Sequence, residues 1–120
     1  MIEPYLVGLG GMIGASLRHV LASRVEAGHF PLGTLTVNVL GSFALGLLTF
    51  AGVGNSTMLL FGVGLCGSFT TFSSFTVDTV RLWEDGAHLA AVAYAIGNFL
   101  GAMGAIGVAW LVVAGVGGLA

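Results

Sequence analysis

The chain reads GLCGSFTTFSSFT over residues 64–76, in the middle of a long apolar run. The glycines of this stretch weaken a helix, and its serine and threonine hydroxyls can satisfy backbone groups that a helix break releases. Non-helical backbone at membrane depth is tolerated only where it is buried in protein or lines a wet cavity. We therefore predict a membrane helix broken between Gly67 and Thr70, with freed carbonyls that could bind a cation.

Composition supports a membrane protein. Of 120 residues, 57% are hydrophobic and 7% are charged, and the mean hydropathy is +1.05. A spanning helix needs about 20 mostly apolar residues. The chain divides into four such runs, which predicts one all-α, multi-pass domain covering residues 1–120. The expected spans are 4–23, 33–51, 57–81 and 88–117.

Several classes of function are excluded by what the sequence lacks. The single cysteine, Cys66, rules out an intrachain disulfide and is expected to be a small core residue. The three histidines, His19, His29 and His88, have no metal-ligand spacing, and no nucleophile is paired with a base. We therefore expect no enzyme, and the absence of a basic patch argues against nucleic acid as a partner.

The orientation signal is weak. Four spans place residues 24–32 and 82–87 on one side of the membrane, where Arg24 and Arg81 favour the cytoplasm. There is no lysine in the chain. With so little bias, the chain could insert in both orientations.

The second span carries a polar stripe. Thr34, Asn38, Ser42 and Gly46 recur every four residues and so share one helix face. An asparagine at mid-membrane depth is costly unless it is paired. Interhelical hydrogen bonding explains one such residue, whereas an aligned set also fits the lining of a polar path.

Small residues mark close helix packing. Gly10 and Gly14 form a small-xxx-small face in the first span, which lets helices approach closely in lipid. Tyr94 and Asn98 are the polar exceptions in the fourth span. The small face of that span consists of Ala93, Gly97, Gly101, Ala105 and Ala109.

Three further residues point to an anion. Arg18 lies inside the first span, either as a snorkelling interfacial charge or as a fixed positive charge at the mouth of an anion path. Phe72 and Phe75 are three residues apart and share a helix face among hydroxyls. Because aromatic rings have positive edges, they could face a bare anion without a full counter-charge.

At these residues the chain resembles the Fluc (CrcB) family of small bacterial fluoride channels. The most specific match is GxCGSxTTFSSF at 64–75, supported by GGMIGASLRH at 10–19 and GTLTVNVLGSF at 33–43. The resemblance implies a fluoride-specific channel that lets the ion leave the cell passively and so relieves fluoride toxicity. It also implies an antiparallel, dual-topology homodimer with two pores, embedded in the lipid of the bacterial cell (inner) membrane.

The resemblance also implies roles for single residues. The backbone carbonyls of Gly67 and Thr70 would hold a structural sodium ion between the two chains. The chain departs from the family at Ser68, where a second glycine is common, and at Asp78, where glutamate is usual. The implied anion pathway comprises the vestibule charge Arg18, the amide of Asn38, the ring edges of Phe72 and Phe75, the polar-track serines Ser73 and Ser74, and Asn98 as the strong donor of the fourth span.

Two alternatives were weighed against a channel. A proton-coupled exporter of the small multidrug resistance kind needs a carboxylate deep in the first span, and that span has only Glu3 at its edge. A non-transporting packing protein would explain the glycine faces but leaves the aligned Thr34, Asn38 and Ser42 without a role.

Overall fold

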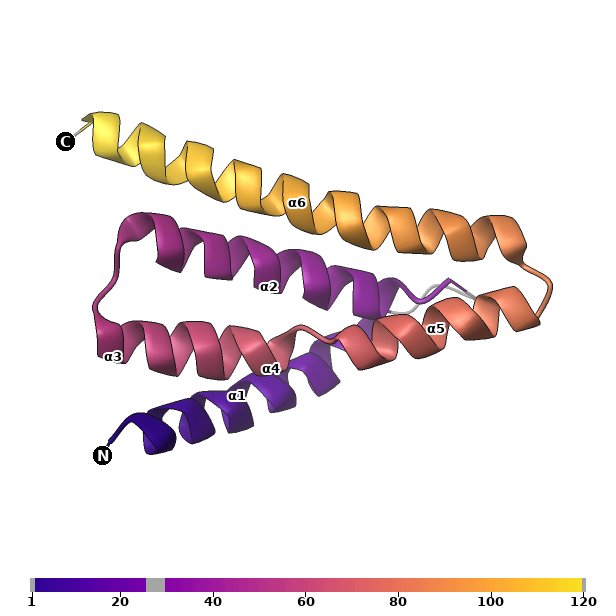
Figure 1. Cartoon of the computed structure of the whole chain (residues 1–120), viewed down its shortest axis with the longest axis horizontal. Coiled ribbons are helices and arrows are strands. Elements are labelled where there is room, and N and C mark those ends of the chain that lie inside the picture. Colours follow the sequence, from indigo (N-terminus) through magenta and orange to yellow (C-terminus); the bar gives the residue numbers. More distant parts are fainter. Residues whose placement is uncertain (1, 26–29, 120) are drawn as a thin grey trace.

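A computed structural model describes residues 2–25 and 30–119 (Figure 1). Every element within those ranges is helical. His29, one of the histidines considered above, lies outside them. The helices are α1 (Glu3–Arg24), α2 (Leu32–Ala51), α3 (Asn55–Thr57), the π-helix η1 (Met58–Cys66), α4 (Gly67–Phe69), α5 (Phe72–Glu84) and α6 (His88–Leu119).

Within residues 2–25 and 30–119, four helical stretches are long and apolar enough to cross a membrane. The third of these combines α3, η1, α4 and α5. The prediction of an all-helical chain with four helices of spanning length is therefore confirmed. The four stretches are Glu3–Arg24, Leu32–Ala51, Asn55–Glu84 and His88–Gly117.

The connections alternate between the two ends of the bundle. The N-terminus, the C-terminus and the turn between α2 and α3 lie at one end (Figure 1). The C-terminal end of α1 and the α5–α6 connection lie towards the other end. Arg24 ends α1, and Arg81 lies in the last turn of α5. This is the alternation expected for four successive spans.

The third span changes its backbone twice. Residues Met58–Cys66 form a π-helix, which is rare and which sequence periodicity did not predict. Gly67 keeps helical torsion angles (φ −61°, ψ −36°). Thr70 and Thr71 are extended, with ψ values of 158° and 121°, and α5 starts at Phe72 (Figure 1).

Hydroxyl groups satisfy the backbone at this α4–α5 junction. The Thr70 hydroxyl donates to the carbonyl of Cys66 at 3.0 Å. The Thr71 hydroxyl caps α5 by accepting from the backbone N–H of Ser74 at 3.1 Å. The Thr71 hydroxyl therefore supplies the acceptor that a continuous helix would have given Ser74, whereas the Cys66 carbonyl also keeps its helical bond from the Thr70 N–H at 3.1 Å.

Glycines bring α1 and the first half of the third span into backbone contact. A Cβ atom at Gly10 would collide with the carbonyl oxygen of Leu60, and one at Gly14 with that of Leu65. From the other side, a Cβ atom at Gly64 would lie 2.7 Å from the carbonyl oxygen of Val7. The predicted close approach at Gly10 and Gly14 is confirmed.

The small face of α6 is only partly used within one chain. Ala105 and Ala109 are buried, and a Cβ atom at Gly46 of α2 would lie 2.9 Å from the Ala109 side chain. Towards the N-terminal end of α6, Ala93 is exposed and Gly97 has open space beside it. A Cβ atom at Gly101 would lie 2.9 Å from the Val39 side chain, so close packing against α2 extends along that face from Gly101 to Ala109.

The bundle is thin and has a small core. Its principal extents are 49 × 35 × 20 Å. Only 11–22% of each candidate span is buried within the chain. Cys66 is 3% exposed, as expected for a small core residue. The principal cluster of buried residues, Leu82, Ala91 and Tyr94, joins α5 to α6.

Candidate functional site

A side chain of α2 pairs with the extended backbone of the third span. The Oδ1 atom of Asn38 accepts from the backbone N–H of Thr71 at 2.8 Å, and its Nδ2 atom donates to the carbonyl of Thr71 at 3.2 Å. The same Nδ2 atom donates to Oδ1 of Asn98 on α6 at 2.9 Å. Asn38 therefore supplies both bonds that a neighbouring strand would have given Thr71.

This pairing gives the predicted pore amide a definite structural task. Thr71 is 8% exposed and Asn98 is 6% exposed. Asn98 is fixed in turn, because its Nδ2 atom donates to the carbonyl of Tyr94 at 2.9 Å. Both amide hydrogens of Asn38 are donated to protein oxygens. Within a single chain, Asn38 therefore stabilises the α4–α5 junction.

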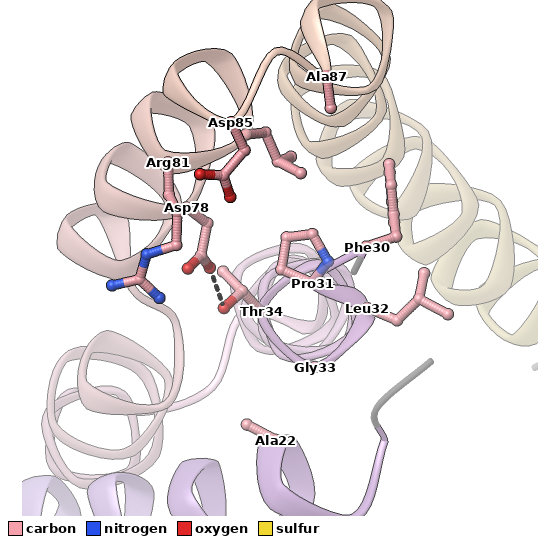
Figure 2. Close-up of a pocket in the computed structure, with 11 residues that line it drawn as sticks. Ala22, Phe30, Pro31, Leu32, Gly33, Thr34, Asp78, Arg81, Asp85 and Ala87 are labelled. Atoms are coloured by element: carbon pink, nitrogen blue, oxygen red, sulfur yellow. Dashed lines mark hydrogen bonds between the residues drawn. The ribbon is translucent and has the colours of Figure 1, made fainter. Parts of the chain in front are cut away.

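A second polar cluster surrounds a carboxylate one helical turn after Phe75. Oδ2 of Asp78 accepts from the hydroxyl of Thr34 at 2.9 Å and from that of Tyr94 at 3.1 Å. Figure 2 shows the bond between Thr34 and Asp78 beside the side chain of Arg81. The carboxylate thus joins α2, α5 and α6.

Four aromatic rings run along the same region. The centroids of Phe72 and Phe75 are 5.8 Å apart, and Phe75 stacks on Tyr94 at 5.7 Å with an interplanar angle of 28°. Phe30 meets Tyr94 edge-on at 5.6 Å. Phe75 is partly buried, whereas Phe72 is 78% exposed. The two phenylalanines expected to face the anion are therefore close together but differ in burial.

Arg18 lies at a small open cleft. This cleft has a volume of about 250 Å³ and is framed by α1, α2 and the start of α5. It combines one guanidinium group with the hydroxyls of Thr71 and Ser74, which suits a small anion, whereas the Ser23 and Thr34 hydroxyls donate to His19 and Asp78. Its lining residues are Arg18, His19, Ala22, Ser23, Thr34, Val37, Thr71 and Ser74.

A larger pocket of about 780 Å³ opens at the end of the bundle that carries the α5–α6 connection (Figure 2). Thr34 lines both the pocket and the cleft, so the two are neighbours. The charged residues that line the pocket are Asp78 and Arg81 of α5 and its C-cap residue Asp85. The Asp78 cluster therefore forms part of the wall of this pocket, since both Asp78 and Thr34 line it.

The residues expected to bind sodium lie at the junction. Gly67 is exposed and Thr70 is partly buried. The backbone N–H of Thr71, which would reach back to the Gly67 carbonyl in a continuous helix, binds Asn38 instead. Within the described ranges no group of three His, Cys, Asp or Glu side chains could hold a metal.

The structure brings most of the predicted site residues to one region. Asn38 and Asn98 are hydrogen-bonded, Phe72 and Phe75 are ring neighbours, and Ser74 shares the cleft with Arg18. Ser73 is exposed, and its hydroxyl lies 3.4 Å from that of Thr71.

The sequence did not predict a site role for Tyr94, although this side chain contacts both the aromatic rings and the polar cluster around Asp78. It is fully buried, stacks on Phe75 and donates to Asp78. The signal was present, since Tyr94 and Asn98 are four residues apart on one helix face. What the sequence could not supply was the partners on α5.

The fold and site define a small polytopic membrane protein in which polar and aromatic side chains gather around the extended threonines. The sequence profile described as CrcB-like protein, Camphor Resistance (CrcB), matches residues 5–116. The chain belongs to the CrcB family.

Curated relatives match over nearly the whole chain. Fluoride-specific ion channel FluC 2 of Haloarcula marismortui is 61% identical over 91% of this chain and 92% of its own length. Fluoride-specific ion channel FluC 1 of Halobacterium salinarum is 51% identical with the same coverage. Fluoride-specific ion channel FluC of Chelativorans sp. is 48% identical over 92% of this chain and 96% of its own length.

Proposed function

We propose that this chain is a fluoride-specific ion channel that lets fluoride leave the cell passively. The observation that carries the proposal is 61% identity, over nine-tenths of the chain, to a protein named for that activity. The cleft at Arg18 supports it, because a guanidinium group and hydroxyls suit a small anion. A channel needs no reacting groups, so the protein is not an enzyme.

The arrangement suggests how an anion moves. Arg18 raises the local concentration of anions at the cleft without closing around them, because the cleft is open and Arg18 is the one arginine among its lining residues. Beyond Ser74, the edges of Phe75 and Phe72 offer weak positive potential in place of a charge. A lining that binds weakly at several points lets the ion leave again.

The functional unit in this proposal is an antiparallel homodimer of single-domain chains with two pores. The thin shape of one chain and the exposure of Phe72, Ser73 and Gly67 support it, because residues expected to work in a pore lie on its surface. A second copy inserted upside down would cover them. Each pore would then draw on both chains, within the lipid of the cell membrane.

A structural sodium ion at the dimer axis is part of the same proposal. The carbonyls of Gly67 and Thr70 lie beside the extended residues, where a helix end leaves acceptors without intrahelical donors. Carbonyl oxygens are suitable ligands for a hard monovalent cation. Replacing sodium with a larger cation is expected to weaken the dimer, which size-exclusion chromatography would measure.

Fluoride efflux from liposomes tests the main proposal. Purified protein is reconstituted with potassium fluoride inside, valinomycin is added to carry the compensating potassium, and a fluoride electrode records release. We expect rapid efflux that depends on the protein. If fluoride stays inside while the protein is folded and dimeric, the channel proposal is wrong.

Labelling from one side of the membrane tests the dual topology. Ser56 is exposed next to the α2–α3 turn, so Ser56→Cys in a Cys66→Ala background provides a single accessible thiol. We expect an impermeant maleimide to label about half of the chains in sealed cells. Complete labelling or no labelling would indicate a single orientation.

A further inference from the structure

Tyr94 holds α5 at two points. Its ring stacks on that of Phe75 at 5.7 Å, and its hydroxyl donates to Asp78 at 3.1 Å. Phe75 and Asp78 are three residues apart and lie on the same face of α5. One side chain of α6 therefore fixes the rotation of α5 at the level where the anion is proposed to pass.

Tyr94 is itself firmly placed. It is 0% exposed and, with Val37, is one of the two largest fully buried side chains. Phe30 packs edge-on against its ring at 5.6 Å with an interplanar angle of 85°. Thr34 shares the acceptor atom Oδ2 of Asp78 with the tyrosine hydroxyl. With neighbours on several sides, the ring forms a rigid support for Phe75.

The stack determines which part of the Phe75 ring an anion can meet. An aromatic ring has a negative face and a positive edge. Tyr94 covers one face of Phe75, so turning that face towards the anion path would require the stack to break. Phe72 has no such support, being 78% exposed and in contact with Phe75 alone among the described rings.

We propose that Tyr94 is a positioning residue that keeps the ring edge of Phe75 towards the anion and thereby sets the preference for fluoride. This inference rests on the proposed function. Tyr94 acts through Phe75, by its ring stack and its hydrogen bond to Asp78. Its effect should therefore appear first in the position of the Phe75 ring.

The test combines a spectroscopic and a transport measurement. 4-Fluorophenylalanine is placed at position 75, and its ¹⁹F NMR resonance is recorded for the wild type, Tyr94→Leu and Tyr94→Phe. Removing the stack in Tyr94→Leu should move the resonance, whereas Tyr94→Phe keeps a ring and should leave it nearly unchanged. If Tyr94→Leu does not give a folded dimer, Tyr94→Met replaces it.

Transport is measured on the same variants without the label. An aromatic pair contributes enough to change a rate or a preference about two- to tenfold. Tyr94→Leu should lower the ratio of fluoride to chloride efflux by that factor, and Tyr94→Phe should restore most of the ratio. Phe99→Leu is the matched control, because Phe99 lies on the same helix but is 64% exposed; it should move neither the resonance nor the ratio.

The outcomes separate this inference from the function on which it rests. An unchanged Phe75 resonance in Tyr94→Leu overturns the positioning role, whatever the efflux assay gives. A shifted resonance with unchanged flux and unchanged anion ratio overturns the link to selectivity. If the folded wild type passes no fluoride, the proposed function fails, and the selectivity claim fails with it even when the resonance moves.

Discussion

The two halves of the third span are held in contrasting ways. Residues 58–69, before the extended threonines, lie against α1 through backbone-to-backbone contacts at Gly10 and Gly14. Residues 72–84, after them, are joined to α2 and α6 by side chains, through rings and hydrogen bonds. The first half is fixed by the absence of side chains and the second by their chemistry.

This difference suggests that the first half of the third span contributes mainly to stability and the second half mainly to transport. Close backbone packing gives lipid-embedded helices much of their association energy but offers nothing that distinguishes one ion from another. Polar and aromatic groups at membrane depth are costly to bury unless paired, so their gathering in one half favours a functional role. We therefore expect changes in the first half to affect folding and changes in the second to affect transport.

Gly14→Val should give the largest effect. The added Cβ atom would collide with the backbone of Leu65, which cannot move aside as a side chain can. Overpacking of this kind costs about 3 kcal/mol or more where the backbone must shift. The thermal midpoint of the purified protein should fall sharply. Gly8→Val on the same helix is the control, because Gly8 has open space; equal losses in both variants would contradict the packing argument.

Asn38→Ala should give the second-largest effect, and it should lower both thermal stability and fluoride efflux. It removes the partners of the Thr71 N–H and C=O groups, and an unsatisfied buried group costs about 1–3 kcal/mol. Thermal unfolding should show this loss, and fluoride efflux should fall with it. Asn55→Ala at an exposed position should change neither. A fully stable and active Asn38→Ala protein would show that the junction does not need this side chain.

Phe75→Ile should separate function from folding. The substitution keeps an apolar side chain but removes the ring edge, so we expect efflux to drop by about tenfold, equivalent to about 1.4 kcal/mol, while the dimer elutes normally. Phe61→Ile provides the control, since Phe61 is exposed in the first half of the span. Unchanged flux in Phe75→Ile would remove this ring from the mechanism.

Thr34→Val should give the smallest effect. It is nearly isosteric and removes one of the two hydroxyls that bind Asp78, leaving the bond from Tyr94. Hydrogen bonds between membrane helices average about 0.6 kcal/mol, so the thermal midpoint should fall only slightly. Thr36→Val, two residues on and without a side-chain bond to the described residues, should have no effect. A loss as large as that of Asn38→Ala would mean that Asp78 depends on Thr34 alone.

Spacing in the sequence predicted the packing faces better than it predicted the partners. Gly10 and Gly14 were identified because a four-residue repeat of small residues is sufficient to mark a contact in lipid. Thr34 and Asn38 were placed on one polar face, and both do bind α5 or the extended residues before it. Which atoms they bind could not be predicted, because Asp78 and Thr71 are more than thirty residues away.

The π-helix was not anticipated. Hydrophobic periodicity does not distinguish an i→i+5 turn from an α-helix in a segment that is apolar all round, as residues 58–66 are. The position of the extended residues was also only approximate, since Gly67 is helical and Thr70 and Thr71 are extended. Glycine permits a change of backbone, but the hydroxyl caps and Asn38 stabilise it one turn later.

Composition and spacing were enough to establish a membrane protein of four helices, its small-residue faces and its polar stripe, because lipid imposes those patterns on any sequence that it surrounds. The motif at 64–76 was enough to suggest the family. Only the folded chain paired Asn38 with the backbone of Thr71 and placed Tyr94 against Phe75 and Asp78. Those contacts join different helices, and they exist only once the bundle has packed.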